Sequence, residues 1–146
     1  MARTPVRAII ARDQPLIGRT DDTVQTAAER MAEHRCGSIL VCDGGKLRGI
    51  FTEGDLLVRV VAARRDPART KLFEVMTPDP DTVAASEPVV EAVRQMDACG
   101  YRHLPVVEAG RVIGMISIGD LIHTIILQQD ETIGQLNTLI SDPYPG

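Results

Sequence analysis

The 146-residue chain contains an internal repeat, which restricts its possible folds more than any other feature of the sequence. When the sequence is shifted by 65 residues, positions 15–59 align with positions 80–124 without a gap. Ten pairs are then identical, namely Pro15/Pro80, Val24/Val89, Ala27/Ala92, Met31/Met96, Val41/Val106, Gly45/Gly110, Gly49/Gly114, Gly54/Gly119, Asp55/Asp120 and Leu56/Leu121. Chance does not gather glycines and a carboxylate at one offset, so we expect a duplicated structural unit.

The first copy predicts elements in the order β-α-β-β-α. Asp21 is the expected N-cap of a helix in which apolar residues recur at helical spacing. A strand over 38–42, a Gly-Gly turn and a strand over 46–51 are typical of a β-hairpin. A second helix is expected to begin at Thr52. The second copy predicts the same elements, with Ser86 as N-cap, strands over 103–107 and 111–116, and a helix from Ser117.

The predicted fold class is α+β, with repeat 1 over residues 6–62 and repeat 2 over residues 72–126. A linker spans 63–81 and a C-terminal extension spans 127–146. The linker carries a basic patch, which we interpret as a solvated helix end because cations suit helix C-termini. The patch consists of Arg64, Arg65, Arg69 and Lys71. The extension has a partly helical apolar stripe, which fits either a dimer-packing helix or a strap on its own domain.

The composition argues against several classes of function. The net charge of −4 and the pI near 5.3 disfavour non-specific DNA binding. With two Phe, two Tyr and no Trp, the chain has few residues that could stack on single-stranded nucleic acid. No apolar run reaches the ~18 residues of a membrane span, and the first residues lack the apolar stretch of a secretory signal. Three cysteines without a C-x-x-C pair argue against a disulfide framework, so we expect a cytoplasmic protein.

The most specific local motif is a glycine, two apolar residues, a hydroxyl and, three residues after the hydroxyl, an aspartate. It occurs from Gly49 to Asp55 and again from Gly114 to Asp120. One interpretation is a capping box at a helix start. The other is a nucleotide site, in which the helix N-terminus binds phosphate, the carboxylate binds ribose and the glycine permits close approach. Recurrence of the motif in both copies favours the nucleotide site.

This motif and the internal repeat together resemble a pair of CBS domains. Two further segments support the resemblance, Tyr101-Arg-His-Leu-Pro-Val106 and Glu74-Val-Met-Thr77. The family is named after cystathionine β-synthase, and the resemblance covers roughly residues 6–126. It implies two repeats packed sheet to sheet about a pseudo-two-fold axis. It also implies two clefts for adenosine-containing ligands, with AMP, ADP or ATP expected first and NADH or S-adenosylmethionine as further candidates. A homodimer in the form of a flat disc of four repeats is implied as well.

The resemblance assigns ligand contacts residue by residue. Asp55 and Asp120 match the ribose-binding acid, while Thr52 and Ser117 match the hydroxyl on the phosphate side. Charge-assisted hydrogen bonds from the ribose to Asp120 mean that its loss should lower affinity about tenfold to hundredfold. Because Asp120 is expected at an exposed helix start, the same loss should hardly affect folding. The other expected contacts are Thr82, Val83, Tyr101, Arg102, His103 and Pro105 for one cleft, and Ile17, Gly18, Gly37, Ser38 and Ile39 for the other.

The two clefts are expected to be unequal in charge. Arg102 and His103 stand where members of the family often place phosphate-contacting cations, whereas their counterparts Gly37 and Ser38 carry no charge. A phosphate-rich ligand should therefore favour the cleft that Arg102 reaches. His103 also has a simpler interpretation, as a histidine at a strand start that is satisfied by its neighbours.

Two rival functions have less support from the sequence. A hydrolase would need a G-x-S-x-G elbow, which is absent around Ser117. A metal site built from His34, Cys36 and Cys42 matches no common zinc spacing.

The sequence thus predicts a non-catalytic module that needs no cofactor, senses an adenosine ligand and relays its occupancy to an unidentified client protein. The linker and the C-terminal segment are the expected moving parts. Nucleic-acid and membrane partners are not expected. The alternative is a CBS pair that serves only as a dimerisation and docking scaffold, and both interpretations stay open at this point.

Overall fold

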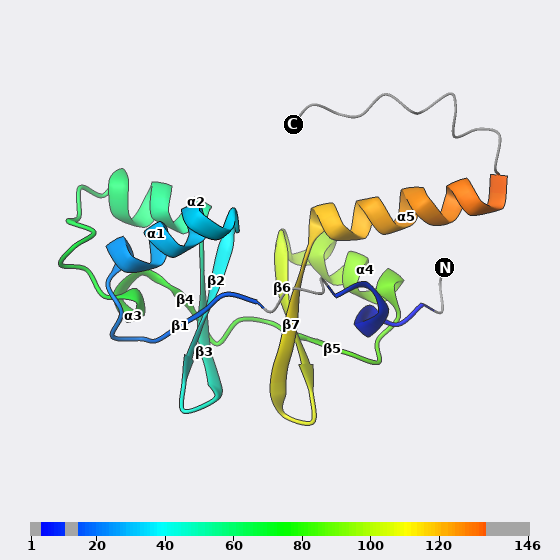
Figure 1. The fold of residues 1–146 in the computed structure, drawn as a ribbon, viewed down its shortest axis with the longest axis horizontal. Coiled ribbons are helices and arrows are strands. Elements are labelled where there is room, and N and C mark those ends of the chain that lie inside the picture. The colour runs from blue at the N-terminus through cyan, green and yellow to red at the C-terminus, as the bar shows by residue number, and fades with distance from the viewer. Residues whose placement is uncertain (1–3, 11–14, 134–146) are drawn as a thin grey trace.

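The computed structural model describes residues 4–10 and 15–133 of the chain, and it shows two β-sheets side by side, each carrying its own helices (Figure 1). One sheet has the strand order β1-β2-β3-β4 and the other the order β5-β6-β7. In both sheets the first strand pairs in parallel with the second, and the second and third form an antiparallel hairpin. The predicted α+β class and the duplication are confirmed.

Both copies follow the predicted order of elements. The first copy consists of β1 (Ile17–Gly18), α1 (Val24–His34), β2 (Ser38–Asp43), β3 (Lys46–Thr52), α2 (Glu53–Asp55) and the π-helix η2 (Leu56–Val61). The second consists of β5 (Val83–Ala84), α4 (Val89–Cys99), β6 (His103–Glu108), β7 (Arg111–Ser117) and α5 (Ile118–Ile133). A 3-10 helix η1 (Val6–Ile9) precedes the first copy, while α3 (Leu72–Val75) and β4 (Thr77–Pro78) precede the second.

The turns of the two hairpins have the backbone conformation that the sequence predicts. Gly44 and Gly45 have φ values of 56° and 81°, and Ala109 and Gly110 have values of 52° and 77°. Two consecutive residues with positive φ are typical of the type I′ turn, whose twist matches that of the flanking strands. The glycine-containing pairs therefore set the register next to each turn, and an irregularity between Val41 and Cys42, repeated between Val106 and Val107, shifts it further along the hairpins.

The N-caps predicted at Asp21 and Ser86 are wrong. The cap of α1 is Thr23, whose Oγ1 accepts a hydrogen bond from the amide of Thr26 at 3.1 Å. The corresponding position before α4 is Pro88, which provides no side-chain cap. Each helix thus begins two residues later than predicted, because a backbone carbonyl from a distant segment already binds its first amide.

These carbonyls come from the segments that precede the repeats. The amide of Val24 donates to the carbonyl oxygen of Thr70 at 2.8 Å, and the amide of Val89 donates to that of Thr4 at 2.8 Å. The segment before the second repeat therefore caps the first helix of the first repeat, and the N-terminal segment does the same for the second repeat.

The same two segments also complete the hydrophobic cores. Val6 of η1 is fully buried in the core of the second copy, with Val89, Leu104 and Leu121 among its neighbours. Leu72 of α3 is fully buried in the core of the first copy. Each core is therefore built from one repeat and the segment that precedes the other repeat.

The two sheets contact each other through a third apolar cluster. Leu40, Cys42 and Ile50 from the first sheet pack with the partly buried Val112 and Met115 from the second. The two hairpins stand side by side in Figure 1, as this contact requires. The predicted packing of sheet against sheet is confirmed.

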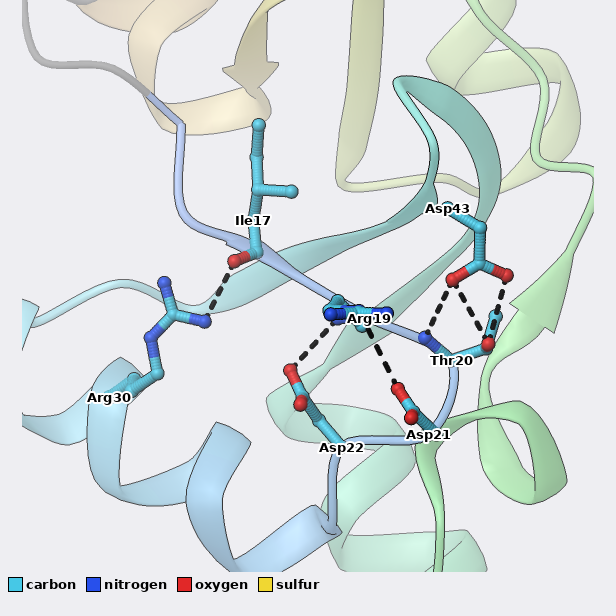
Figure 2. Close-up of polar contacts among 7 residues, drawn as sticks. All are labelled: Ile17, Arg19, Thr20, Asp21, Asp22, Arg30 and Asp43. Carbon is cyan, nitrogen blue, oxygen red and sulfur yellow. Dashed lines mark hydrogen bonds and ion pairs between the residues drawn. The ribbon is translucent and has the colours of Figure 1, made fainter.

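Polar contacts anchor β1 at the edge of the first sheet (Figure 2). The guanidinium of Arg30 donates to the carbonyl oxygen of Ile17 at 2.7 Å. Just beyond the strand, the backbone amide and the Oγ1 of Thr20 donate to the carboxylate of Asp43 at 2.9–3.3 Å. These bonds tie the short edge strand to α1 and to the end of β2.

The second helices of the two copies differ in form. The amide of Ala62 donates to the carbonyl of Leu57, five residues earlier, so the first copy ends in a π-helix. The second copy has a regular helix of 16 residues that runs into the predicted C-terminal extension, of which residues 134–146 lie outside the described part. Among the described residues, no helix has both the length and the apolar character to cross a membrane.

Candidate ligand-binding cleft

A cleft of about 490 Å³ lies where the two copies meet. One wall is the start of the second helix of the first copy, from Thr52 to Asp55. A second wall is the linker from Thr77 to Asp81, and the third is the segment from Gly100 to His103 before and at the start of β6. Both copies and the linker therefore contribute to one cleft.

Both aspartates of the repeated motif form a capping box. The amide of Thr52 donates to Asp55 Oδ2 at 3.0 Å, and the amide of Asp55 donates to Thr52 Oγ1 at 3.1 Å. Ser117 and Asp120 form the same two bonds at 3.0 and 3.1 Å. Because these bonds use only one carboxylate oxygen, each aspartate can cap its helix and still offer Oδ1 to a ligand.

The expectation that Asp120 lies at an exposed helix start is wrong. The side chain of Asp55 is only 14% exposed, and Asp120 is also half-buried. Burial in the wall of a cleft strengthens a charge-assisted hydrogen bond. It also means that replacing either residue removes a cap, which costs about 1 kcal/mol of stability.

The glycines that open the motif have a structural reason that differs from the predicted one. A Cβ on Gly49 would collide with the Met76 side chain and lie 2.8 Å from the carbonyl oxygen of Thr77. A Cβ on Gly114 would collide with the side chain of Ile10. Both glycines therefore admit the segment that precedes the opposite repeat, whereas the sequence analysis attributed them to close approach of a ligand.

The cleft brings residues of different copies together. Thr52 and Asp55 of the first copy lie with Tyr101, Arg102 and His103 of the second. This crossed arrangement follows from the packing of the two hairpins, because the end of β3 faces the start of β6 across the interface. The carboxylate that shares a cleft with Arg102 is thus Asp55.

Two side chains of the second copy show how the cleft modifies proton affinity. A hydrogen bond from the hydroxyl of Tyr101 to the carboxylate of Asp81 raises the pKa of Tyr101. Burial lowers the pKa of His103, against the opposing effect of the carboxylates of Glu53 and Asp120. His103 is therefore held toward its neutral form, in which one ring nitrogen can accept and the other can donate.

Glu53 and His103 approach each other near the pseudo-two-fold axis. A Cβ placed on Gly37 would lie 3.4 Å from Glu53 Oε1 and 3.6 Å from His103 Nε2. Gly37 therefore lies next to the cleft, and a larger side chain at this position would crowd Glu53 and His103.

Several predicted contact residues lie elsewhere. Thr82 and Val83 line a shallower hollow beside α4, and Ile17 lines another near the two hairpin turns. Val83 and Ile39 are core side chains, so only their backbone groups can reach a ligand. The remaining predicted residues with buried side chains or backbone are Gly18, Ser38 and Pro105.

The second predicted cleft is only partly described. Ser117 and Asp120 form its helix start. Ile10 occupies the place against Gly114 that Met76 occupies against Gly49. Residues 11–14 lie outside the described part of the chain.

The sequence analysis missed the acidic residues of the described cleft. Glu53, Asp79 and Asp81 line it together with Asp55, and Arg102 is the guanidinium in its lining. Glu53 could have been found, because it lies inside the repeated motif where the second copy has Ile118. Asp79 and Asp81 gave no such signal, because the path of the linker across the first copy is a tertiary feature.

The rival sites receive no support from the geometry. Cys36 is exposed and its Sγ donates to the carbonyl of His34, whereas Cys42 is buried in β2, where burial raises the pKa of its thiol. Within residues 4–10 and 15–133, no three His, Cys, Asp or Glu side chains are grouped to hold a metal ion. Ser117 Oγ accepts the amide of Asp120, which is a capping role.

Two β-α-β-β-α copies, packed through their sheets and lining one cleft, define a tandem repeat module. The family model described as CBS domain matches residues 6–62 and 72–127. The chain therefore belongs to the CBS domain family and carries two CBS domains in tandem.

Known proteins with similar sequences or structures agree with this assignment. The chain is 34% identical over 130 residues to the mitochondrial CBS domain-containing protein CBSX3 of Arabidopsis thaliana, covering 86% of this chain and 63% of that protein. This chain covers only 15% and 25% of the length of two further relatives. A putative signal-transduction protein with CBS domains from Burkholderia ambifaria has a TM-score of 0.80 and 36% identity, over 86% of this chain and 96% of that one.

Two of the similar solved structures contain adenosine-type ligands. A CBS domain protein from Pyrobaculum aerophilum complexed with AMP has a TM-score of 0.77 and 25% identity, over 86% of this chain and 97% of that one. A CBS domain pair in complex with 5-methylthioadenosine and S-adenosyl-L-methionine has a TM-score of 0.75 and 25% identity, over 84% of this chain and 99% of that one.

Proposed function

We propose that the protein is a non-catalytic sensor that binds an adenosine-containing ligand and relays its occupancy to a separate client protein. The observation that carries this proposal is the cleft in which a half-buried carboxylate, Asp55, lies with the guanidinium of Arg102 and the linker. Similar solved structures bind AMP, 5-methylthioadenosine or S-adenosylmethionine, which supports the ligand class.

In the proposed complex, the Oδ1 of Asp55 accepts hydrogen bonds from the ribose diol. Thr52 and the backbone of Gly54 approach the phosphate, because the amides of Glu53 and Asp55 already donate to the carbonyl of Gly37 and to Thr52 Oγ1, and Arg102 is its cation. The ring of Tyr101 and the linker flank the adenine. By pseudo-symmetry, Asp120 and Ser117 serve the second cleft, with the backbone of Ser38 and Ile39 beside them.

The charge of the described cleft favours a ligand with few phosphates. Four carboxylates, those of Glu53, Asp55, Asp79 and Asp81, line the cleft with one guanidinium, that of Arg102, and Asp55 has a further ion pair with Arg59 at its edge. Carboxylates therefore still outnumber the cations, and because like charges repel, each added phosphate should weaken binding unless a cation accompanies it. We therefore rank AMP above ADP and ATP, which reverses the sequence-based expectation of a phosphate-rich ligand in the cleft of Arg102. S-adenosylmethionine, whose sulfonium is cationic, fits this charge better than NADH does.

We further propose that two chains form a homodimer of four repeats. The second helices expose apolar side chains at equivalent positions of the two copies, with Leu57 62% and Val61 61% exposed, and Ile122 51% and Ile126 45% exposed. A face that carries the same pattern twice is self-complementary under a two-fold axis. Three free thiols are consistent with the cytoplasm as the proposed compartment.

A thermal-shift and calorimetric titration tests the sensor. The full chain is titrated with AMP, ADP, ATP, NADH and S-adenosylmethionine, beside Asp55→Ala, Asp120→Ala and the exposed control Asp97→Ala. Ligand at 100 times its dissociation constant adds about 2.7 kcal/mol, a shift of several degrees for a chain of this length. We expect Asp55→Ala to weaken AMP binding about tenfold to hundredfold and Asp97→Ala to leave it unchanged.

The same titration distinguishes the ligand sensor from the alternative, a dimerisation and docking scaffold. If the folded wild type responds to none of the five ligands, the sensor proposal is overturned. The protein would then be a dimerisation and docking scaffold, as the apolar face of the second helices would suggest. Sedimentation of the wild type beside Val61→Glu with Ile126→Glu tests the dimer, which we expect the double variant to dissociate.

A further inference from the structure

A single guanidinium in the first copy joins the candidate ribose carboxylate to the opposite wall of the cleft. Arg59 Nη1 donates to the carbonyl oxygens of Val75 and Met76, at 3.1 Å each. Its Nε lies 3.6 Å from Asp55 Oδ1, the oxygen that the capping box leaves free. Arg59 therefore contacts both Asp55 and the backbone that leads into the linker wall.

The two carbonyls that Arg59 binds are at the end of α3. The last carbonyls of a helix have no partner within the helix, so a cation that binds them holds the chain where it leaves the helix. The residues that follow directly, Thr77 to Asp81, form one wall of the cleft. The wall is therefore held at its start by Arg59, and further along by the antiparallel pairing of β4 with β3 and by the bond from the amide of Asp79 to the carbonyl of Arg48 at 3.0 Å.

The second copy has a different arrangement at the equivalent position. Thr124 lies 65 residues after Arg59, and its hydroxyl donates to the carbonyl oxygen of Asp120 within its own helix at 3.0 Å. Its side chain is too short to reach another segment. The local backbone differs as well, because Arg59 lies in the π-helix η2 whereas Thr124 lies in the regular helix α5. Single π-helical turns in otherwise α-helical segments are frequent at functional sites.

We propose that Arg59 is a positioning residue that couples Asp55 to the linker wall, so that a ligand bound to Asp55 changes the stability of residues 76–81. A ribose hydroxyl that donates to Oδ1 shares this oxygen with Arg59, and the same guanidinium holds the carbonyls of Val75 and Met76. Coupling of this kind runs in both directions, so the position of the linker also sets the affinity of Asp55 for its ligand. The ligand arm of this inference rests on the proposed function, whereas the brace exists in the free protein.

Hydrogen exchange by mass spectrometry on the full chain tests the coupling. The variants are Arg59→Met, which keeps the length but removes the charge and the donors, and Arg59→Lys, which keeps the charge. Thr124→Val is the matched control in the second copy. In the free protein we expect Arg59→Met to increase exchange of the amides of 76–81 about tenfold, Arg59→Lys to increase it less, and Thr124→Val to leave it unchanged.

The second arm repeats the exchange at saturating AMP. We expect AMP to slow exchange of 76–81 in the wild type and in Thr124→Val, and to slow it much less in Arg59→Met even when its cleft is filled, because only direct contact with the ligand then protects the linker. A purely structural role would lower the melting temperature of Arg59→Met but keep the AMP-induced protection, which would overturn the coupling.

The two arms separate this inference from the proposed function. If the free Arg59→Met exchanges like the wild type over 76–81, the brace is wrong, whatever AMP does. If the wild type binds no adenosine ligand while Arg59→Met still loosens the linker, the proposed function fails and the ligand coupling fails with it, but the brace is confirmed as a contact of the free protein.

Discussion

The two copies share one frame but differ in the residues that face the cleft. Both have the same hairpin turn, the same capping box and the same glycine under a crossing segment. The first copy adds Glu53 and Arg59, where the second has Ile118 and Thr124. The second adds Arg102 and His103, where the first has Gly37 and Ser38. After the duplication, the residues that fix the fold remained alike and those around the cleft diverged.

From this difference we expect that the two proposed clefts are not interchangeable sites. In the described cleft, an aspartate of the first copy meets a cation of the second. In the other cleft, Asp120 is paired by symmetry with Gly37 and Ser38, which have no charge. One ligand-sized site therefore combines the charged residues of both copies, and we expect it to dominate binding.

The largest expected effect concerns the crossing segments. Gly49→Ala would place a Cβ 2.8 Å from the backbone carbonyl of Thr77, which cannot move without shifting the linker. We expect a loss of about 2–3 kcal/mol of unfolding free energy in urea titrations. Gly114→Ala collides only with the flexible side chain of Ile10, and we expect about 1 kcal/mol.

Gly119→Ala serves as the control for this pair, because the nearest atom to an added Cβ is Ser117 Oγ at 3.7 Å. Equal losses of unfolding free energy in Gly49→Ala and Gly114→Ala would show that the segments crossing the two glycines are equally rigid. This result would contradict the expected difference between the two copies.

A smaller effect is expected at the ends of the middle strands. Asp43 accepts hydrogen bonds from the amide and hydroxyl of Thr20 in a partly buried site (Figure 2). At the equivalent position, Glu108 forms an exposed ion pair with Arg7 at 2.7 Å. We expect Asp43→Ala to cost about 1.5–3 kcal/mol and Glu108→Ala to cost about 0–1 kcal/mol.

Salt distinguishes the two contacts in the same experiment. Addition of about 0.5 M NaCl screens interactions between exposed charges that are more than a few ångströms apart. It should therefore remove the loss of stability caused by Glu108→Ala and leave most of the loss caused by Asp43→Ala. A larger loss of unfolding free energy for Glu108→Ala than for Asp43→Ala would contradict the conclusion that the partly buried contact of Asp43 contributes more than the exposed ion pair of Glu108.

The smallest expected effect is a pH dependence that belongs to the second copy alone. Burial lowers the pKa of His103 below its usual 6.5, so the unfolded chain binds a proton at higher pH than the folded one. Stability is then complete above pH 6.5 and declines as the pH falls from 6.5 toward the lowered pKa. Replacement by the residue of the first copy, His103→Ser, should flatten this part of the curve measured by thermal unfolding.

The control for this prediction is His34→Ser, at an exposed position. If His103→Ser and the wild type lose the same stability between pH 6.5 and 5.5, another group causes the decline and the burial of His103 is not its origin.

The sequence predicted the elements well where the contacts are local. The hairpin of residues 38–52 follows from the Gly44-Gly45 pair, since positive φ at two successive positions needs little more than the right residues. The capping boxes follow from a hydroxyl and an acid three residues apart. The N-caps at Asp21 and Ser86 failed for the opposite reason, because the backbone carbonyls of Thr70 and Thr4, which are distant along the chain, bind the first amides of those helices.

The candidate site was predicted in part. Thr52, Asp55, Tyr101, Arg102 and His103 were identified, and the cleft contains all five. The sequence did not predict that these residues lie in one cleft, because the repeat offset aligns Asp55 with Asp120 but does not show which of the two lies next to Arg102. The acidic residues of the linker were missed, since no local pattern indicates that the linker crosses the first copy.

The sequence by itself determined the duplicated unit, its turns, the start of the second helix of each copy and its CBS family, because these depend on residues a few positions apart or on one fixed offset. Only the tertiary structure decided that each core takes a segment from before the other repeat, and that the cleft combines Asp55 with Arg102. The physical reason is that packing between the copies depends on surfaces that come together only when both have folded. No spacing within either copy encodes which surface will meet which.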